Sequence, residues 1–272
     1  MNCKNVGMPS VRADQHRVFD GPFIAMAHRG GALLPENIGI ENTVTAFRNA
    51  VALGYRWLET DVHATADGQL IAFHDSRLDR VTDMSGEVDQ LPWSAVRRAR
   101  IQGEPIPTLD ELFETFPEAR FNIDIKAPGA IEPLVRAIDR HRAQDRVCVG
   151  SFGSSRLREF RRLIGTHVAT SAVPEQVLWN ALNPLPARIR NRWVTDPSVA
   201  LQVPTVREIR GVKVPVFTKR LARHAHTVGK QVHVWTIDDA DIMHDLIDAG
   251  ADGIITDRPD VLRAVLTERG LW

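Results

Sequence analysis

Short apolar runs alternate with amphipathic stretches along most of the chain. Eight runs have the length and composition of buried strands, and they cover residues 23–28, 57–62, 121–126, 147–152, 167–172, 200–203, 232–237 and 253–256. Helical periodicity lies between most of them, over residues 43–53, 109–116, 131–142, 154–164, 218–228 and 239–249. Because strand–helix units repeated eight times are the pattern of a (β/α)8 barrel, the sequence predicts an α/β fold of the TIM-barrel type.

The alternative is a doubly wound open sheet, but no glycine-rich dinucleotide turn follows the first strand. Three segments lie outside the alternation. Residues 1–21 read as a loose arm, residues 75–107 as an inserted loop region without a clear strand, and residues 179–197, with three prolines, as an irregular excursion. We therefore expect one catalytic barrel domain over residues 22–272, with an inserted hairpin and loop region after its second strand.

Composition mainly excludes classes of protein. The 272 residues are 43% hydrophobic and carry 34 basic and 34 acidic side chains. A formal net charge of zero argues against a nucleic-acid binder that uses a basic surface, and against a polybasic membrane anchor. Cys3 and Cys148 are too few for a disulfide framework. Residues 1–21 lack a signal-type apolar stretch, and no run reaches membrane-spanning length. We expect a cytoplasmic protein without a stable membrane anchor.

The second predicted strand carries two acids on one face. Alternation places Glu59, Asp61 and His63 together, with His63 nearest the following turn as a possible rim residue. Two neighbouring carboxylates repel each other unless a cation neutralises them, and oxygen ligands suit Mg²⁺ or Ca²⁺. The alternative is a salt bridge to an arginine or lysine inside the barrel.

A tight turn follows this strand. Asp67-Gly68 is a favoured hairpin pair. If these two residues form the whole loop, Asp61 lies opposite His74. The hairpin would then return an imidazole to the two carboxylates.

Polar side chains also mark two other strand ends. Asn122, Asp124 and Lys126 share one face of the third strand, and barrel enzymes keep their sites at the carboxyl ends of strands. The alternative is an internal network such as Asp124–Lys126. His28 and Arg29 lie at a glycine-sharpened turn after the first strand, where an arginine fork suits phosphate. With two imidazoles as proton donor and acceptor, the set predicts hydrolysis of an anionic ester.

These motifs resemble the glycerophosphodiester phosphodiesterases. The matching strings, in order, are His28-Arg29-Gly30, Glu41-Asn42-Thr43, Glu59-Thr60-Asp61, Asp67-Gly68, His74-Asp75, Asn122-Ile123-Asp124-Ile125-Lys126, Ser151-Phe152, Trp235-Thr236 and residues 253–259. The resemblance implies hydrolysis of small-molecule glycerophosphodiesters to glycerol 3-phosphate and an alcohol, with Mg²⁺ or Ca²⁺. It implies that His28 and His74 are the general acid and base.

The resemblance also implies the binding roles. Glu59, Asp61 and Asp124 would hold the metal, and Arg29 and Lys126 the phosphate. Glu41 would lie near the metal or the glycerol hydroxyls. From its place at a strand end, Trp235 could form a wall of the pocket or be an ordinary core residue.

Two positions depart from or complicate the family pattern. The family usually has glutamate where this chain has Asp124, so the ion must lie closer to that strand or bind through water. Related sphingomyelinase D-type barrels resemble this arrangement with an aspartate. The motif could also be aligned on Glu36-Asn37, but a helix pattern begins after Glu41-Asn42-Thr43. The second copy is therefore preferred, and Glu36 becomes a loop residue over the site.

Two other functions stay open. A lysophospholipase D would need an apolar rim for an acyl chain, for which the candidates are Leu178, Trp179, Leu182, Leu185 and Trp193. A barrel that binds phosphodiesters without hydrolysing them is disfavoured by the pair of histidines. The sequence also leaves open the oligomeric state. The attacking oxygen could belong to water or to the glycerol 2-hydroxyl, and which histidine is the acid depends on this choice.

Overall fold

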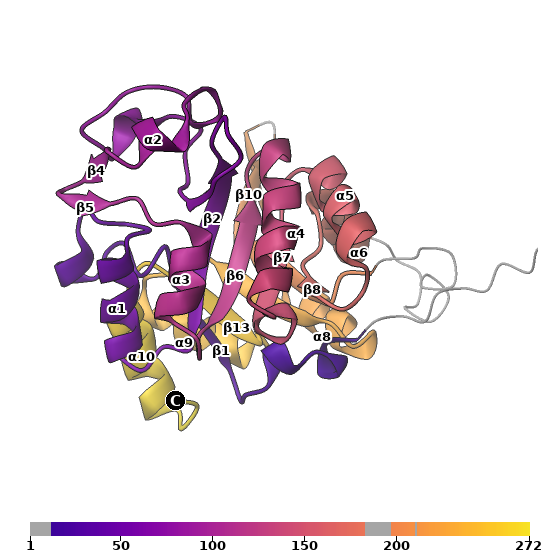
Figure 1. Cartoon of the computed structure of the whole chain (residues 1–272). Coiled ribbons are helices and arrows are strands. Elements are labelled where there is room, and N and C mark those ends of the chain that lie inside the picture. Colours follow the sequence, from indigo (N-terminus) through magenta and orange to yellow (C-terminus); the bar gives the residue numbers. More distant parts are fainter. Residues whose placement is uncertain (1–11, 183–196, 210) are drawn as a thin grey trace, which may run out of the picture.

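The computed structural model describes residues 12–182, 197–209 and 211–272 (Figure 1). Its main sheet contains eight parallel strands in the order β8-β7-β6-β2-β1-β13-β12-β9. A parallel bridge between Ser171 and Ala200 joins the two ends of this order. The strands are β1 (Ile24–His28), β2 (Trp57–Ala64), β6 (Arg120–Ile125), β7 (Val147–Gly150), β8 (Ala169–Thr170), β9 (Ala200–Pro204), β12 (Gln231–Trp235) and β13 (Gly253–Thr256). All eight predicted strands are present, and the predicted barrel is confirmed.

Helices surround the strands (Figure 1). They are α1 (Val44–Ala52), α3 (Leu109–Thr115), α4 (Ile131–Arg140), α5 (Ser154–Ile164), α6 (Pro174–Leu182), α8 (Lys219–Thr227), α9 (Ala240–Asp248) and α10 (Pro259–Glu268). Thr43, Thr108, Thr218 and Asp239 cap four of them, because each side chain accepts a hydrogen bond from a backbone N–H of the first turn. The six predicted helices are confirmed. None of the helices in the described parts of the chain has the length and apolarity to span a membrane.

Helices α6 and α10 were not predicted. Both begin at a proline, which suits the first helical position because its missing N–H has no partner there. The expected irregular excursion is therefore wrong for residues 179–182, which continue α6. Residues 183–196 lie outside the described part of the chain.

Alternation along the strands separates two apolar layers. Leu58, Phe121 and Val234 belong to the layer between the barrel and its helices. Met26 and Trp57 belong to a second cluster, inside the barrel at the amino ends of the strands. The interior positions at the carboxyl ends are polar, and they form the candidate site described below.

The N-terminal segment closes the amino end of the barrel. Residues 13–15 and 17–19 form short 3₁₀ helices, and Ala13, Val18 and Phe19 join the interior cluster. The Phe19 ring stacks on Trp57 with 5.8 Å between centroids. A loose arm was therefore the wrong expectation for residues 12–21. Two turns with few apolar residues are too short to show a period in the sequence.

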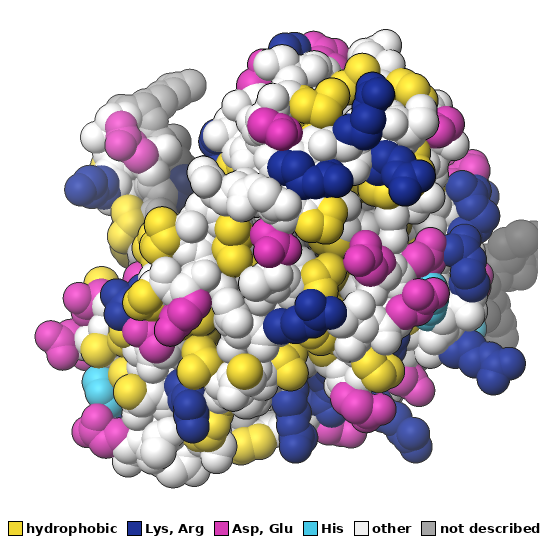
Figure 2. Space-filling model, turned by 60° about the vertical axis from the view of Figure 1, so that its left-hand side comes forward, with side chains coloured by type: hydrophobic (Ala, Val, Ile, Leu, Met, Phe, Trp, Pro, Cys, Tyr) yellow, Lys and Arg dark blue, Asp and Glu magenta, His cyan; other side chains and the backbone are white. Residues whose placement is uncertain are grey.

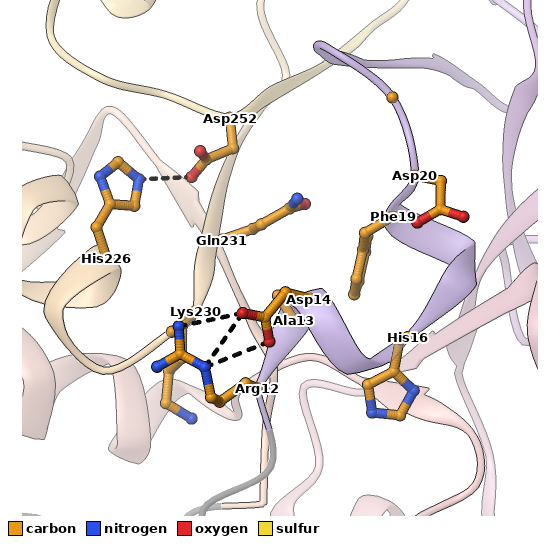
Figure 3. A pocket seen from close by; sticks show the side chains of 12 residues that line it. Arg12, Ala13, Asp14, His16, Phe19, Asp20, His226, Lys230, Gln231 and Asp252 are labelled. Carbon is orange, nitrogen blue, oxygen red and sulfur yellow. Dashed lines mark hydrogen bonds and ion pairs between the residues drawn. The ribbon is translucent and has the colours of Figure 1, made fainter.

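A hollow of about 450 Å³ lies beside this segment (Figure 3). Its charged side chains include two ion pairs, Arg12–Asp14 at 3.2 Å and His226–Asp252 at 2.8 Å. The segment is at the end of the barrel opposite the insertion (Figure 1).

Removing the Phe19 ring should destabilise the protein without changing its chemistry. We expect Phe19→Ala to lower the free energy of unfolding by about 3–5 kcal/mol, because a buried aromatic side chain leaves a cavity. Chemical denaturation measures this loss. The matched variant Ile242→Ala removes an apolar side chain that is 45% exposed on α9 and should cost less than about 1 kcal/mol. Equal losses in the two variants would contradict the packed role of Phe19.

The insertion follows the hairpin of β2 and β3 (Leu70–Ala72) and lies over the carboxyl end of β2 (Figure 1). It contains α2 (Trp93–Val96) and an antiparallel pair, β4 (Arg100–Ile101) and β5 (Glu104–Pro105), so the expectation of no clear strand is wrong. Its own apolar cluster includes Phe73, Leu78 and Ile101. Basic and acidic side chains are interspersed on the face seen in Figure 2. The insertion is thus a packed unit beside the mouth of the barrel.

Candidate active site

The carboxyl ends of β1, β2, β6 and β13 bring the candidate side chains together. Parallel pairing aligns His28 with Glu59 and Asp61 with Asp124. Asp257 directly follows β13, and its carboxylate lies 2.8 Å from Nδ1 of His28. The predicted acids Glu59, Asp61 and Asp124 therefore lie on neighbouring strands together with His28, at the end where barrel enzymes have their active sites.

Cationic side chains compensate the charges of Asp61 on β2 and Asp124 on β6. Lys126 Nζ lies 2.9 Å from Asp61 Oδ1 and 2.7 Å from Asp124 Oδ2, and Arg29 Nε lies 3.3 Å from Asp61 Oδ2. Both the internal Asp124–Lys126 network and a salt bridge on β2 are thus present. The burial of Lys126 lowers its pKa, but the two carboxylates outweigh this effect and raise it. The site holds Lys126 charged.

Glu59 and Asp61 differ in their electrostatics. Burial raises the pKa of Glu59 to about 7, and the charge of Asp61 adds to the effect. Burial would also raise the pKa of Asp61, but nearby cations, Lys126 first among them, outweigh it and lower that pKa. Glu59 accepts a hydrogen bond from the backbone N–H of Arg29 at 3.2 Å and lies 3.8 Å from Nε2 of His28. Of the two acids of β2, Glu59 is therefore the one whose negative charge is less compensated.

Each candidate histidine has a carboxylate at Nδ1. Asp257 lies 2.8 Å from Nδ1 of His28, and Asp75 lies 2.5 Å from Nδ1 of His74. Because an ionised carboxylate only accepts, Nδ1 of each ring donates and Nε2 remains for proton transfer. Burial lowers the pKa of His28, but Glu59 and Asp257 outweigh it and raise the pKa. Asp257 belongs to the matching string of residues 253–259, but its position in the sequence did not predict that it contacts His28.

The hairpin register differs from the expected one. His63 pairs with Ile71, and the backbone N–H of Phe73 donates to the carbonyl of Asp61 at 2.9 Å. Asp61 therefore faces Phe73 and not His74, so the two-residue loop was wrong. Thr65 and Gln69 close a three-residue loop, the next most common hairpin connection. The hairpin still ends at His74, whose charge lowers the pKa of Asp61.

The loop between β1 and α1 supplies further contacts. Arg29 Nη1 lies 3.1 Å from Glu41 Oε1. Asn42 donates to Asp61 at 3.4 Å and accepts from Thr60 at 2.8 Å, which links the loop to β2. The Glu41-Asn42-Thr43 copy of the motif is therefore the one at the site, whereas Glu36 is exposed. The sequence strings contained Asn42, but only the fold shows that it contacts Asp61.

Aromatic side chains border the site. Trp235 ends β12 and meets the ring of Phe152 edge-on at 5.7 Å between centroids. Lys126 Nζ lies 5.7 Å from the Phe152 ring, which is 58% exposed. His63 is buried, and its Nε2 lies 3.2 Å from the carbonyl oxygen of His74. Trp235 and Phe152 thus stand at the mouth, while His63 contacts the backbone that carries His74.

The implied metal can be compared with these side chains. Within residues 12–182, 197–209 and 211–272, no three His, Cys, Asp or Glu side chains form a preassembled metal cluster. The donors fit a hard cation in kind, because Glu59, Asp61 and Asp124 offer only carboxylate oxygens. The raised pKa of Glu59 also marks a place where added positive charge is favourable. Asp124 would have to exchange its contact with Lys126 for one with the ion.

A TIM barrel with two carboxylate-oriented imidazoles and cationic side chains at its carboxyl end has the features of a phosphodiester hydrolase. The model of the Glycerophosphoryl diester phosphodiesterase family matches residues 28–261. A protein of Mycobacterium tuberculosis, "Probable glycerophosphodiester phosphodiesterase 2", is 44% identical over 98% of this chain and 97% of its own. The chain therefore belongs to the glycerophosphoryl diester phosphodiesterase family.

Two further similarities extend the comparison. A rat protein named lysophospholipase D is 28% identical over 89% of this chain and 85% of its own. The solved structure of an Oleispira antarctica phosphodiesterase in complex with sn-glycerol 3-phosphate has a TM-score of 0.72. It is 22% identical and covers 89% of this chain and 96% of that one. The second similarity confirms the fold.

Proposed function

We propose that this enzyme hydrolyses glycerophosphodiesters to glycerol 3-phosphate and an alcohol with His28 and His74 as its acid–base pair. The observation that carries the proposal is that both rings bind a carboxylate through Nδ1, which leaves Nε2 of each for proton transfer. One ring accepts the proton of the attacking oxygen, and the other protonates the departing alkoxide. Family membership and the named relatives support the substrate class.

Arg29 and Lys126 bind the phosphate in this proposal. Both are charged, both lie beside Asp61, and the guanidinium of Arg29 can donate two parallel hydrogen bonds to phosphate oxygens. Trp235 and Phe152 border the space where the substrate's alcohol group extends. Glu41 holds Arg29 in place through their 3.1 Å contact.

Glu59, Asp61 and Asp124 would hold a divalent cation, Mg²⁺ or Ca²⁺. When bound, it would neutralise charge on the phosphate and polarise its P–O bonds. The carboxylates of Glu59 and Asp61 belong to one strand and that of Asp124 to its neighbour in register.

The test is a substrate panel measured with Mg²⁺, with Ca²⁺ and with EDTA. We expect glycerol 3-phosphate to be released from glycerophosphocholine with at least one of the ions and to fall to background with EDTA. Full activity in EDTA would contradict the metal, and binding without turnover in any divalent ion would favour the non-hydrolysing barrel. A trapped cyclic phosphate would identify the glycerol 2-hydroxyl as the attacking group.

Lysophosphatidylcholine belongs in the same panel because of the similarity to a lysophospholipase D. Of the candidate rim residues, Leu178 and Trp179 are 52% and 46% exposed on α6, whereas Leu185 and Trp193 lie outside the described residues. Preferred turnover of lysophosphatidylcholine over glycerophosphocholine would support the second function.

A further inference from the structure

Arg80 joins two parts of the site that the sequence keeps apart. It ends a 3₁₀ helix of the insertion, Leu78–Arg80. Its Nε donates to Asp75 Oδ2 at 2.5 Å and its Nη2 to Oδ1 at 3.2 Å. Its Nη1 and Nη2 also donate to the two carboxylate oxygens of Glu41, at 3.1 and 2.7 Å. One guanidinium therefore holds two carboxylates, each through two hydrogen bonds.

Each of these carboxylates contacts a side chain of the proposed mechanism. Asp75 lies against Nδ1 of His74, and Glu41 lies against Arg29. Arg29 in turn lies 3.3 Å from Asp61. A continuous series of charged contacts thus runs from His74 through Asp75, Arg80, Glu41 and Arg29 to Asp61 of β2.

We propose that Arg80 is a positioning residue for the reaction, which holds Asp75 against His74 and Glu41 against Arg29. The inference rests on the proposed roles of His74 and Arg29. We do not place Arg80 against the reacting atoms, because its Nε, Nη1 and Nη2 donate their four hydrogen bonds to Asp75 and Glu41. Its effect on the reaction passes through the orientation of the His74 ring and the Arg29 guanidinium.

The hydrogen bond between His74 and Asp75 is partly exposed to water, which explains why Arg80 is needed to hold it. The side chain of His74 is 32% exposed and that of Asp75 is 24% exposed, so water competes for their hydrogen bond. Burial raises the pKa of Asp75, but Arg80 and His74 outweigh it and lower the pKa to about 2. Asp75 therefore remains an ionised acceptor for the Nδ1–H of His74. A charged fork with two parallel donors fixes the plane of that carboxylate better than a single bond.

A purely structural role is the competing explanation, in which Arg80 only fastens the insertion to the barrel. The insertion, however, has its own apolar cluster, in which Phe73, Leu78 and Ile101 are buried. Its fold should therefore survive the loss of one half-exposed side chain.

The chain offers a matched control on the same short helix. Arg77 is its N-cap residue; its side chain is 51% exposed against 47% for Arg80, and it also contacts two carboxylates. Those carboxylates, Asp79 and Glu87, belong to the insertion itself. We expect Arg80→Gln to lower kcat for glycerophosphocholine by about 10- to 100-fold, with a smaller rise in KM, because misoriented groups lose reactivity. Arg77→Gln should stay within about twofold of wild type.

A double-mutant cycle with Asp75→Asn separates positioning from structure. If Arg80 acts through Asp75, the variant with both substitutions should be about as slow as the slower single variant. Losses in kcat that multiply, or wild-type kcat in Arg80→Gln, would overturn the proposal. If Arg80→Gln melts at a lower temperature than the wild type, Arg80→Lys distinguishes positioning from a structural role, because lysine keeps the charge but cannot bridge both carboxylates. Low kcat with restored stability would support positioning, and restored kcat would refute it.

His74→Ala, measured in the same series, distinguishes a failure of the proposed acid–base role of His74 from a failure of the proposed role of Arg80. Full activity in that variant would end the proposed acid–base role of His74. A slow His74→Ala together with a wild-type Arg80→Gln would leave the proposed function in place and refute only the role of Arg80.

Discussion

Replacing His28 by alanine should lower kcat for glycerophosphocholine by about 100- to 10,000-fold, the range that a positioned general acid or base contributes. The reason is the geometry around the ring. Asp257 holds Nδ1 at 2.8 Å, and the ring is largely buried at the end of β1, so the substitution removes a proton-transfer group that is held in one orientation. Steady-state release of glycerol 3-phosphate measures the loss.

His226→Ala is the matched control for this variant. His226 also lies against a carboxylate, that of Asp252 at 2.8 Å, but at the opposite end of the barrel. It should keep wild-type kcat. If His28→Ala turned over substrate as fast as His226→Ala, the acid–base assignment would be wrong, however well both variants folded.

The barrel could be predicted because its strands are buried on both faces. Parallel strands under helices read as short apolar runs, and each run here survives as a strand, from Ile24–His28 to Gly253–Thr256. The N-terminal segment could not be predicted in this way. Its packing depends on Val18 and Phe19 meeting Trp57, a contact between distant residues that leaves no periodic signal.

The same distinction separates the residues of the candidate site that could be predicted from those that could not. Alternation placed Glu59 and Asp61 on one face of their strand and Asp124 on one face of another, because side chains two residues apart on a strand share a face, and the predicted barrel placed polar strand ends together. Asp257 follows β13 and Arg80 ends a 3₁₀ helix of the insertion, and the contact of each depends on where the fold places its segment. A single loop residue decided the hairpin register: three residues between Thr65 and Gln69 instead of two moved Phe73 opposite Asp61. Roles that come from one strand could be predicted, whereas roles that join two segments required the structure.

Glu59 is the residue at which stability and function should conflict. Its side chain is buried, its pKa is raised to about 7 by burial and by Asp61, and its backbone contact is the N–H of Arg29. Glutamine has the same shape and can still accept from that N–H, but it carries no charge. We therefore expect metal-free Glu59→Gln to melt at or above the temperature of the metal-free wild type, and its kcat to fall by about 100-fold or more.

The metal gives this prediction a readout that does not depend on turnover. A ligand at one hundred times its Kd stabilises the folded state by about 2.7 kcal/mol, which corresponds to a rise of roughly 5–10 °C in melting temperature. Saturating Mg²⁺ or Ca²⁺ should produce such a rise in the wild type and in Glu132→Gln, whose glutamate is 75% exposed on α4, but not in Glu59→Gln. A full thermal shift in Glu59→Gln would remove Glu59 from the metal site. The absence of a shift in all three proteins would instead leave Lys126 and Arg29 as the charges that bind the phosphate, because they already neutralise Asp61.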